Sequence, residues 1–270
     1  MTIQKITGFG KREMQLLFAL EQKSNYLFTT QQAKNLLATS DASVKNVLKR
    51  LKQKHRIIRI EKGIYLFAPL KSGVKGNWTE NAFELAPALA KTNDYYIGFA
   101  SAMNYWGMTE QLPTTIWIAL KKQKKQVNAV QAKFIFIKKK KLGEKTVIEI
   151  NNTKVNVSSI EQTIIDGLIF PQHCFGIKGV AQAIYFSRKK IDWLKLKALV
   201  DNEKNIVRRR LGFLLDLLEL NKQAKTFESK FSGVQWLDST EKKQVLMYSK
   251  KWGLKINART NDLLEFKKGF

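Results

Sequence analysis

The chain has 270 residues, of which 44% are hydrophobic and 11% aromatic, so it can bury a core and does not have the composition of a disordered protein. Lys and Arg number 48 against 22 Asp and Glu, which gives a formal net charge of +26. Such a charge favours a polyanionic partner such as nucleic acid, because each neutralised phosphate releases a condensed counterion. The alternative interpretation is a lysine-rich surface that is merely solvated. The length favours two domains.

Cysteine and histidine are too scarce to build a metal centre. The chain contains one cysteine, Cys174, and two histidines, His55 and His173. They cannot form a zinc site of the usual ligand spacing or a disulfide within the chain, and we expect no metal and no cofactor. No apolar run approaches the ~18 residues of a membrane helix. The first twenty residues are charged and show no signal peptide, so we expect a cytoplasmic protein without a membrane partner.

The first seventy residues predict three helices in succession. Residues 11–21 form the first, with an apolar face that we assign to Met14, Leu17 and Phe18. Thr29 or Thr30 can cap a short second helix, and Ser40 or Asp41 can cap a third. The second helix would bury Ala33, Leu36 and Leu37. The third would bury four aliphatic residues at the spacing i, i+3, i+4, i+7, namely Val44, Val47, Leu48 and Leu51.

A β-hairpin is predicted directly after these helices. Residues 56–60 and 64–67 are rich in β-branched and aromatic side chains, and they flank a short turn that ends in Gly63. Pro69 then ends the unit. The order helix, helix, helix, hairpin is typical of a winged helix-turn-helix domain, which binds DNA with its third helix in the major groove.

The outward face of the third helix supports this interpretation, because it carries no acidic residue. Lysine and arginine can reach phosphates, and polar side chains can bond base edges. The hairpin would add a backbone or minor-groove contact. The predicted DNA-binding residues are Ser43, Lys45, Asn46, Lys49, Arg50 and Gln53 on the helix, with Arg59 and Lys62 on the hairpin. The alternative is a winged helix that contacts only proteins.

The remaining chain predicts a larger domain of mixed composition. We assign residues 1–70 to the winged helix-turn-helix domain, 71–76 to a glycine-containing linker and 77–270 to a second domain, so the fold class is α+β (mixed α/β). Helices are expected at 81–90 and 97–106, strands at 116–120 and 133–137, and a hairpin at 146–150 and 154–157 around Asn151-Asn152. From Ser158 onward the chain reads as mostly helical, with helices at about 179–187, 192–199 and 205–220.

Candidate catalytic groups are weak, so we expect no enzyme. Asp166 stands alone on an apolar helix, where an acid is more often a cap or pairing residue than a general base. The pairs Glu144-Lys145 and Glu241-Lys242-Lys243 lack a convincing strand context for a nuclease, which remains the alternative. The aromatic residues of 95–117 are expected in the core. Four basic runs are either solvated or an extended DNA-backbone surface: Lys121-Lys122, Lys124-Lys125, Lys138–Lys141 and Arg208-Arg209-Arg210.

Three segments resemble signatures of the AbiEi antitoxins, in the order of that family. They are YYIGFASAMNYWGMTEQLP at 95–113, SIEQTIIDGL at 159–168 followed by Pro171, and RRRLGFLL at 208–215. The chain departs from the family after Pro171, where Phe175 replaces the first of two glycines and Gly179 replaces a glutamate.

The resemblance implies a bacterial, nucleoid-associated transcriptional regulator of a type IV toxin–antitoxin system. Such a protein represses its own operon by binding inverted repeats in double-stranded operator DNA. Its second domain counters a nucleotidyltransferase-like toxin without forming a stable complex. The alternative is a regulator whose second domain senses a ligand or partner, with no toxin.

Overall fold

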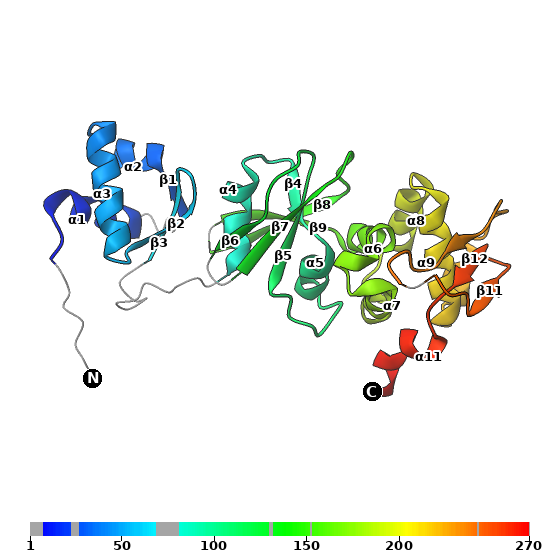
Figure 1. Ribbon diagram of the computed structural model, residues 1–270. Coiled ribbons are helices and arrows are strands. Elements are labelled where there is room, and N and C mark those ends of the chain that lie inside the picture. The colour runs from blue at the N-terminus through cyan, green and yellow to red at the C-terminus, as the bar shows by residue number, and fades with distance from the viewer. Residues whose placement is uncertain are drawn as a thin grey trace. The chain divides into compact units, whose positions relative to one another are not determined.

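The computed structural model describes residues 8–22, 27–68, 81–129, 132–151, 153–241 and 243–269, and the fold is α+β (Figure 1). The chain divides into two compact units. The first comprises residues 1–93 and 125–135, and the second comprises 94–124 and 136–270. The first unit thus adds 81–93 and 125–135 to the predicted N-terminal domain. The predicted linker at 71–76 and Pro69 lie outside the described residues.

The first unit begins with three helices and a small antiparallel sheet. In chain order its elements are α1 (Lys11–Gln22), β1 (Leu27–Thr29), α2 (Thr30–Leu37), α3 (Asp41–Gln53), β2 (Ile57–Glu61) and β3 (Ile64–Phe67). The strand order is β1-β3-β2, with Thr29 opposite Ile64 and Glu61 opposite Ile64 on the other side. The three predicted helices and the hairpin are confirmed. The short strand β1 was not predicted.

Side-chain caps fix where α2 and α3 begin. The Thr29 hydroxyl accepts from the Gln32 N–H at 3.1 Å, and the Gln32 side chain accepts from the Thr29 N–H at 2.7 Å. This reciprocal pair is a capping box, which satisfies two amide groups that the helix leaves free. Ser40 caps α3 by accepting from the Ser43 N–H. Of the predicted alternatives, the structure therefore selects Thr29 and Ser40.

The core of the first unit forms where the three helices meet the sheet. The predicted stripe of α3 is buried throughout: Val44, Val47, Leu48 and Leu51. The buried face predicted for α1 is wrong. Phe18 is 62% exposed, whereas Leu16 and Leu20 are buried beside Leu17. The physical reason is that Leu16, Leu17 and Leu20 form one apolar stripe that packs against the core. Glu13 lies on the same buried side, where it pairs with Lys54 just after α3.

A six-stranded sheet follows, and two short helical turns precede it. Residues Ala82–Leu85 form a 3₁₀ turn that continues into α4 (Ala86–Ala90), as the prediction for 81–90 requires. The strands are β4 (Tyr95–Ile97), β5 (Thr115–Leu120), β6 (Val127–Ala129), β7 (Ala132–Lys138), β8 (Lys145–Ile150) and β9 (Thr153–Ser158). Their order is β6-β7-β5-β4-β9-β8. The predicted helix at 97–106 begins only after Ile97, because this residue pairs with Ile118 and Val157 inside the sheet.

Helices make up most of the second unit. They are α5 (Phe99–Tyr105), α6 (Ile160–Ile169), α7 (Gly176–Ser187), α8 (Trp193–Asp201), α9 (Asn205–Leu217), α10 (Asn221–Lys225) and α11 (Thr260–Leu263). The expectation of a mostly helical C-terminal part fails over 235–256, where β10 (Gln235–Trp236), β12 (Leu254–Ile256) and β11 (Met247–Ser249) form a small mixed sheet. Among the described residues, no helix combines the length and apolarity needed to span a bilayer.

The core of the second unit depends on close approaches at glycine. Trp252 is buried, and the six-membered ring of its indole lies against α9 at Gly212. A Cβ atom at this position would come within 2.1 Å of the Trp252 ring, which is far inside van der Waals contact. The indole N–H is fixed as a donor to Asp216 Oδ2 at 2.7 Å, so the ring cannot move away freely.

We therefore expect Gly212→Ala to lower the free energy of unfolding by about 1–3 kcal/mol, because overpacking a core forces rings and backbone to shift. This loss would appear although alanine favours a helix over glycine by ~1 kcal/mol. Urea unfolding followed by tryptophan fluorescence measures it. Gly8→Ala, where no heavy atom would lie within 4 Å of the new methyl group, is the control. Equal stability of the two variants would contradict the packing described.

Candidate nucleic-acid interface

The outward face of α3 presents the predicted recognition residues together. The aliphatic stripe is buried, so the opposite side of the helix points to solvent. Five predicted residues are exposed on this face: Lys45, Asn46, Lys49, Arg50 and Gln53. They combine two lysines and one arginine with two side-chain amides. The face can therefore hold phosphates by charge and can bond base edges through the amides.

Ser43 differs from the other predicted residues, because it is half-buried and already engaged. Its hydroxyl accepts a hydrogen bond from the guanidinium of Arg12 on α1. This contact places an exposed cation from another helix beside the start of α3. Sequence reasoning missed Arg12, since the two residues are 31 positions apart and no periodicity relates them. The face is thus built from two helices.

An acid lies at the edge of this face but is compensated locally. Asp41, the first residue of α3, is exposed and pairs with Lys34 of α2 at 2.8 Å. The hydrogen bond from Lys34, followed by its charge, lowers the pKa of the Asp41 carboxyl below its usual value. The carboxylate therefore stays ionised, and its charge is matched mainly by Lys34, with a smaller contribution from Lys45 of the exposed face.

The far end of α3 is anchored to α1. The Lys54 ammonium, just after α3, lies 2.6 Å from Glu13 Oε2 and donates to the Gly8 carbonyl at 2.8 Å. Burial alone would raise the pKa of Glu13, but hydrogen bonds from Lys54 and the Gly10 N–H outweigh it and lower that pKa. The Lys54 ammonium is consequently engaged within the first unit, and its contacts fix the orientation of α3 relative to α1.

The hairpin places its two predicted residues at the surface. Lys62 is exposed in the turn between β2 and β3, and Arg59 is exposed on β2. The Arg59 Nε donates to the Glu61 carbonyl at 3.3 Å, so part of its guanidinium is directed along its own strand. All eight predicted residues belong to the first unit, and seven of them are exposed.

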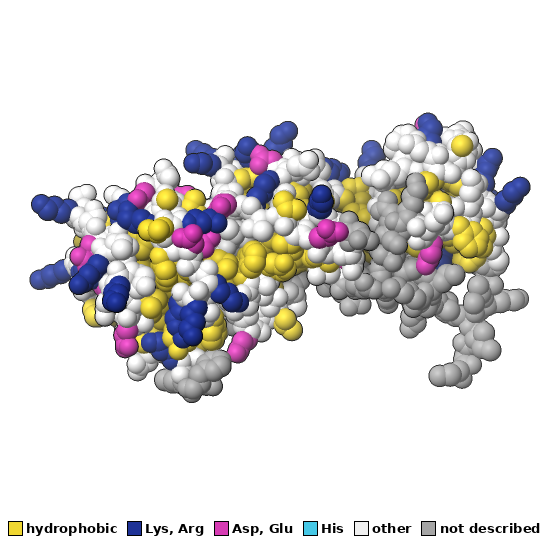
Figure 2. Space-filling model, turned by 180° about the vertical axis from the view of Figure 1, so that it is seen from behind, with side chains coloured by type: hydrophobic (Ala, Val, Ile, Leu, Met, Phe, Trp, Pro, Cys, Tyr) yellow, Lys and Arg dark blue, Asp and Glu magenta, His cyan; other side chains and the backbone are white. Residues whose placement is uncertain are grey.

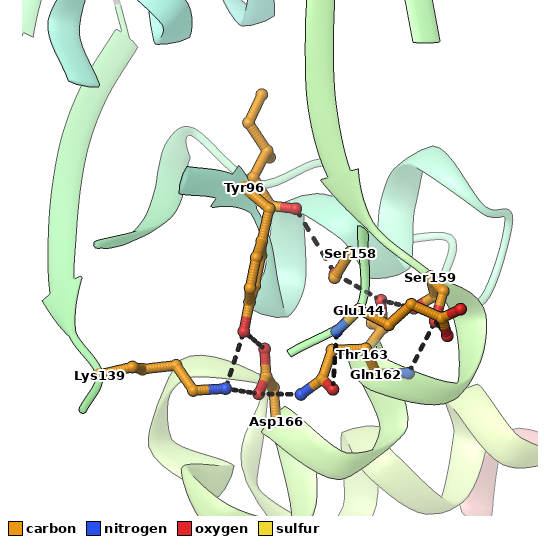
Figure 3. A network of polar contacts seen from close by, with 9 residues as sticks. Tyr96, Lys139, Glu144, Ser158, Ser159, Gln162, Thr163 and Asp166 are labelled. Carbon is orange, nitrogen blue, oxygen red and sulfur yellow. Dashed lines mark hydrogen bonds and ion pairs between the residues drawn. The ribbon is translucent and has the colours of Figure 1, made fainter. Parts of the chain in front are cut away.

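A second polar cluster lies buried in the second unit, where the sheet meets α6 (Figure 3). Asp166 of α6 is 0% exposed and forms an ion pair with Lys139, whose side chain is 9% exposed. Tyr96 of β4 donates its hydroxyl proton to Asp166 Oδ2 at 2.7 Å and accepts from the Lys139 ammonium at 2.7 Å. Gln162, one helical turn earlier, donates to Asp166 Oδ1 at 2.8 Å.

The same cluster continues to the start of α6. Ser159 caps this helix by accepting from the Gln162 N–H at 3.1 Å, and its hydroxyl donates to Glu144 at 3.1 Å. The hydroxyls of Ser158 and Thr163 bond each other at 2.7 Å. The polar groups of this network therefore satisfy one another.

The hydrogen bonds of this network are made within the fold. Burial, and then the neighbouring Asp166 carboxylate, raise the pKa of the Tyr96 phenol far above its usual value, so the hydroxyl stays protonated as a donor. Asp166 has three donors and no exposed surface. This is the pairing role expected for a lone acid on an apolar helix.

Asp166→Asn should lower the free energy of unfolding by about 3–5 kcal/mol, because it leaves the Lys139 ammonium buried without its carboxylate. Adding Lys139→Met to this variant should recover much of the loss, since the amide oxygen can still accept from Tyr96 or Gln162. Thermal and urea unfolding of both variants and of Lys139→Met measure the coupling. Purely additive losses would show that the pair is not coupled.

The basic runs differ in their exposure to solvent. Arg209 and Arg210 are buried, which corrects both interpretations of this run as surface. Arg209 donates to the carbonyls of Ser232, Gly233 and Gly253, and Arg210 donates to those of Leu168 and Trp236. Their guanidinium groups thus tie α9 to backbone oxygens in and beside the small C-terminal sheet and, through Leu168, to α6.

Lysines of the other runs remain at the surface. Lys121 pairs with Asp94 at 2.5 Å, whereas the exposed ammonium groups of the other positions are directed to solvent: Lys122, Lys125, Lys138, Lys140 and Lys141. In the face shown in Figure 2, Lys and Arg side chains are spread widely, with fewer Asp and Glu between them. Whether these lysines contact DNA stays a prediction.

The remaining candidate groups are packed in the core. His173 lies with its ring centroid 4.3 Å from that of Trp117, and burial lowers the pKa of its imidazole. Cys174 is fully buried, and burial raises the pKa of its thiol well above the usual value, so it is a poor nucleophile. Among the described residues, no group of three or more His, Cys, Asp or Glu is placed to hold a metal ion.

The second unit also contains a pocket of about 500 Å³ between the start of α7 and the region around α11. Its lining mixes apolar and charged side chains, including Ile177, Leu246, Lys178, Arg259 and Asp262. The Asp238 carboxylate at its wall already accepts from the Ile177 N–H at 3.0 Å. A small molecule with both apolar and polar groups would fit this lining.

Comparison with known proteins identifies a family and a related fold. Residues 21–157 match a family described as "Family of unknown function (DUF6088)". The chain is similar in structure to the crystal structure of RV2827C protein from Mycobacterium tuberculosis, with a TM-score of 0.68. The two share 12% sequence identity, and the match covers 97% of this chain and 96% of that one. No curated protein matches the sequence.

Proposed function

We propose that this chain, which belongs to the DUF6088 family, binds double-stranded DNA through α3 and represses transcription. The observation that carries the proposal is the exposed face of α3, on which the exposed side chains from Lys45 to Gln53 are all basic or neutral and polar. Helix α2, the turn at 38–40 and α3 follow one another as in a helix-turn-helix, and the paired strands β2 and β3 come next along the chain, which supports a winged helix. The net charge of +26 adds long-range attraction to the phosphates.

The proposed biological role is that of an autorepressor and antitoxin of a type IV pair, in the bacterial cytoplasm at the nucleoid. Its operator would be inverted repeats, and its functional partner a nucleotidyltransferase-like toxin. The support for this part is the resemblance of three segments to AbiEi antitoxins. These segments contribute α5, α6 and α9, whose residues pack in one core. The resemblance is therefore stronger support for a shared fold than for a shared activity.

The α3 face predicts two classes of DNA-binding variant. Asn46→Ala should relax sequence preference by about 1–3 kcal/mol at one base pair, because an amide can bond a base edge in two places. Lys49→Ala and Arg50→Ala should weaken binding to every duplex alike and reduce the salt slope by ~0.9 each. Fluorescence anisotropy titrations of the full chain between 50 and about 200 mM salt would measure both effects.

Lys222→Ala is the matched control, because this exposed lysine lies on α10 in the second unit. It changes the net charge by the same amount as Lys49→Ala but should leave the affinity within about twofold of the unaltered chain. If the two classes of α3 variant bind DNA as the unaltered chain does, the proposed docking is wrong.

The antitoxin role has a separate test. A nucleotidyltransferase-like reading frame beside this gene should arrest growth when expressed alone, and co-expression of this chain should restore growth. The chain carrying both Lys49→Ala and Arg50→Ala should still restore growth, because the second domain is proposed to counter the toxin. Absence of such a neighbouring frame, or no rescue, would leave a DNA-binding repressor without an antitoxin role.

A specific observation favours one alternative for the second unit. The pocket beside α7 could admit a small ligand, which would make the chain a ligand-sensing regulator without a toxin. A nuclease has less support, because Asp166 is enclosed by its own donors. Metal-dependent nicking of plasmid DNA that Asp166→Asn abolishes, with the variant still folded, would favour the nuclease over the repressor.

A further inference from the structure

The wing of the first unit is short and its tip is fixed. Strands β2 and β3 pair up to Glu61 and Ile64, so the turn between them consists of Lys62 and Gly63. Gly63 has φ +80°, in the left-handed region that glycine adopts without strain. Two residues reach at most ~7 Å when extended. The turn therefore offers little chain that could enter a groove.

One tether holds the tip against the start of α2. The Thr30 N–H donates to the Gly63 carbonyl at 3.0 Å. Thr30 is the first residue of α2, and its predecessor Thr29 pairs with Ile64 through β1. The hydrogen bond is made by the turn itself. Any motion of the tip away from the body would break it.

A second tether acts on the neighbouring side chain. The Glu61 carboxylate is 16% exposed and forms an ion pair with Lys91 at 3.0 Å. Lys91 ends α4 in a left-handed conformation, so its position is set by that helix. Strand β2 also contacts β6. All of these residues belong to the first unit, so the wing is held by its own unit on two sides.

The charges of the wing favour a phosphate contact over a base contact. Lys62 is exposed at the tip, and a lysine ammonium is a point charge that carries little base information. Arg59 is the group that could read a narrow minor groove, but it lies on β2 opposite Tyr65 and not in the turn, and its Nε donates to the Glu61 carbonyl. The Glu61 carboxylate close to the tip is held back by its ion pair with Lys91 and adds no positive charge to the wing.

We propose that this wing stays outside the minor groove and touches DNA only through Lys62 on a phosphate, so that sequence is read in the major groove by α3. The inference rests on the proposed function. It goes further by assigning specificity to one groove and to one element.

Exchanging the minor-groove amino group of base pairs tests the proposal. A duplex is selected from a random pool by repeated binding to the full chain. Every guanine is then replaced by inosine, which removes the minor-groove amino group, and in a second duplex every adenine is replaced by 2,6-diaminopurine, which adds one. The major-groove edges keep their donors and acceptors. Affinity for both altered duplexes should stay within about twofold of the parent, well under the ~10-fold that 1.4 kcal/mol represents.

The outcomes distinguish failure of this inference from failure of the proposed DNA-binding function. A tenfold loss with either altered duplex would show that the minor groove is read and would overturn the inference. Replacing guanine by 7-deazaguanine or adenine by 7-deazaadenine removes a major-groove acceptor and should weaken binding at least tenfold at one or more positions. No effect of either replacement at any position also overturns the inference. Enrichment of no duplex, with no measurable DNA binding, would instead refute the proposed function.

Lys62→Ala supplies an independent reading. It should weaken binding to selected and unrelated duplexes by the same factor and reduce the salt slope by ~0.9. Lys91→Ala, which loosens the wing without touching the proposed DNA face, serves as the matched variant and should leave the base preference unchanged. A change of preferred sequence with Lys62→Ala would contradict a contact limited to phosphate.

Discussion

The burial of one aliphatic stripe on α3 decides what the first unit can present to a partner. Val44, Val47, Leu48 and Leu51 pack against α1, α2 and the small sheet, and together they lose almost all of their exposure to water. Fully burying each such side chain contributes roughly 1.5–3 kcal/mol. No other rotation of the helix would bury four aliphatic groups at once. The polar side is therefore turned outward by packing, without any contribution from a bound partner.

Charge is used in two different ways in this strongly basic chain. At the surface of the first unit, cations remain free to meet phosphates. In the second unit, several cations serve the fold instead: Lys139 compensates a buried carboxylate, while Arg209 and Arg210 supply donors to backbone carbonyls. A buried guanidinium has five N–H groups in a fixed fork, which suits it to tie several carbonyls of one small sheet together. Counting basic residues in the sequence therefore overstates the surface available to DNA.

Sequence periodicity predicted the first unit well, because its helices and hairpin are defined by local signals. The caps at Thr29 and Ser40 and the spacing of Val44 to Leu51 are short-range patterns. The face of α1 was misjudged, because Phe18 was taken as buried in place of Leu16 and Leu20. The burial of Glu13 on that face depends on Lys54, 41 residues away. Contacts of that range leave no trace in a window of one helix, and the same holds for Arg12 beside Ser43.

The second unit was harder for a related reason. Its β10, β12 and β11 are two or three residues long, and their pairing is held by arginines from α9 that look solvent-exposed in the sequence. Ile97 lies in a run that is apolar enough for a helix, and only its neighbours Ile118 and Val157 make it a strand. The lone acid Asp166 was correctly expected to pair, but its partner Lys139 could not be distinguished from the exposed lysines on either side of it.

The division of the chain has a consequence for its synthesis. Residues 125–135 belong to the first unit although residues 94–124 belong to the second, so the polypeptide passes between the units at 93/94, 124/125 and 135/136. Domains generally fold as units while the ribosome is still elongating the chain. Here the first unit cannot gather all of its residues until position 135, the midpoint of the chain, has emerged from the exit tunnel, and by then more than half of the chain has been translated. Likewise, truncating the chain after residue 93 would remove residues 125–135 from the first unit.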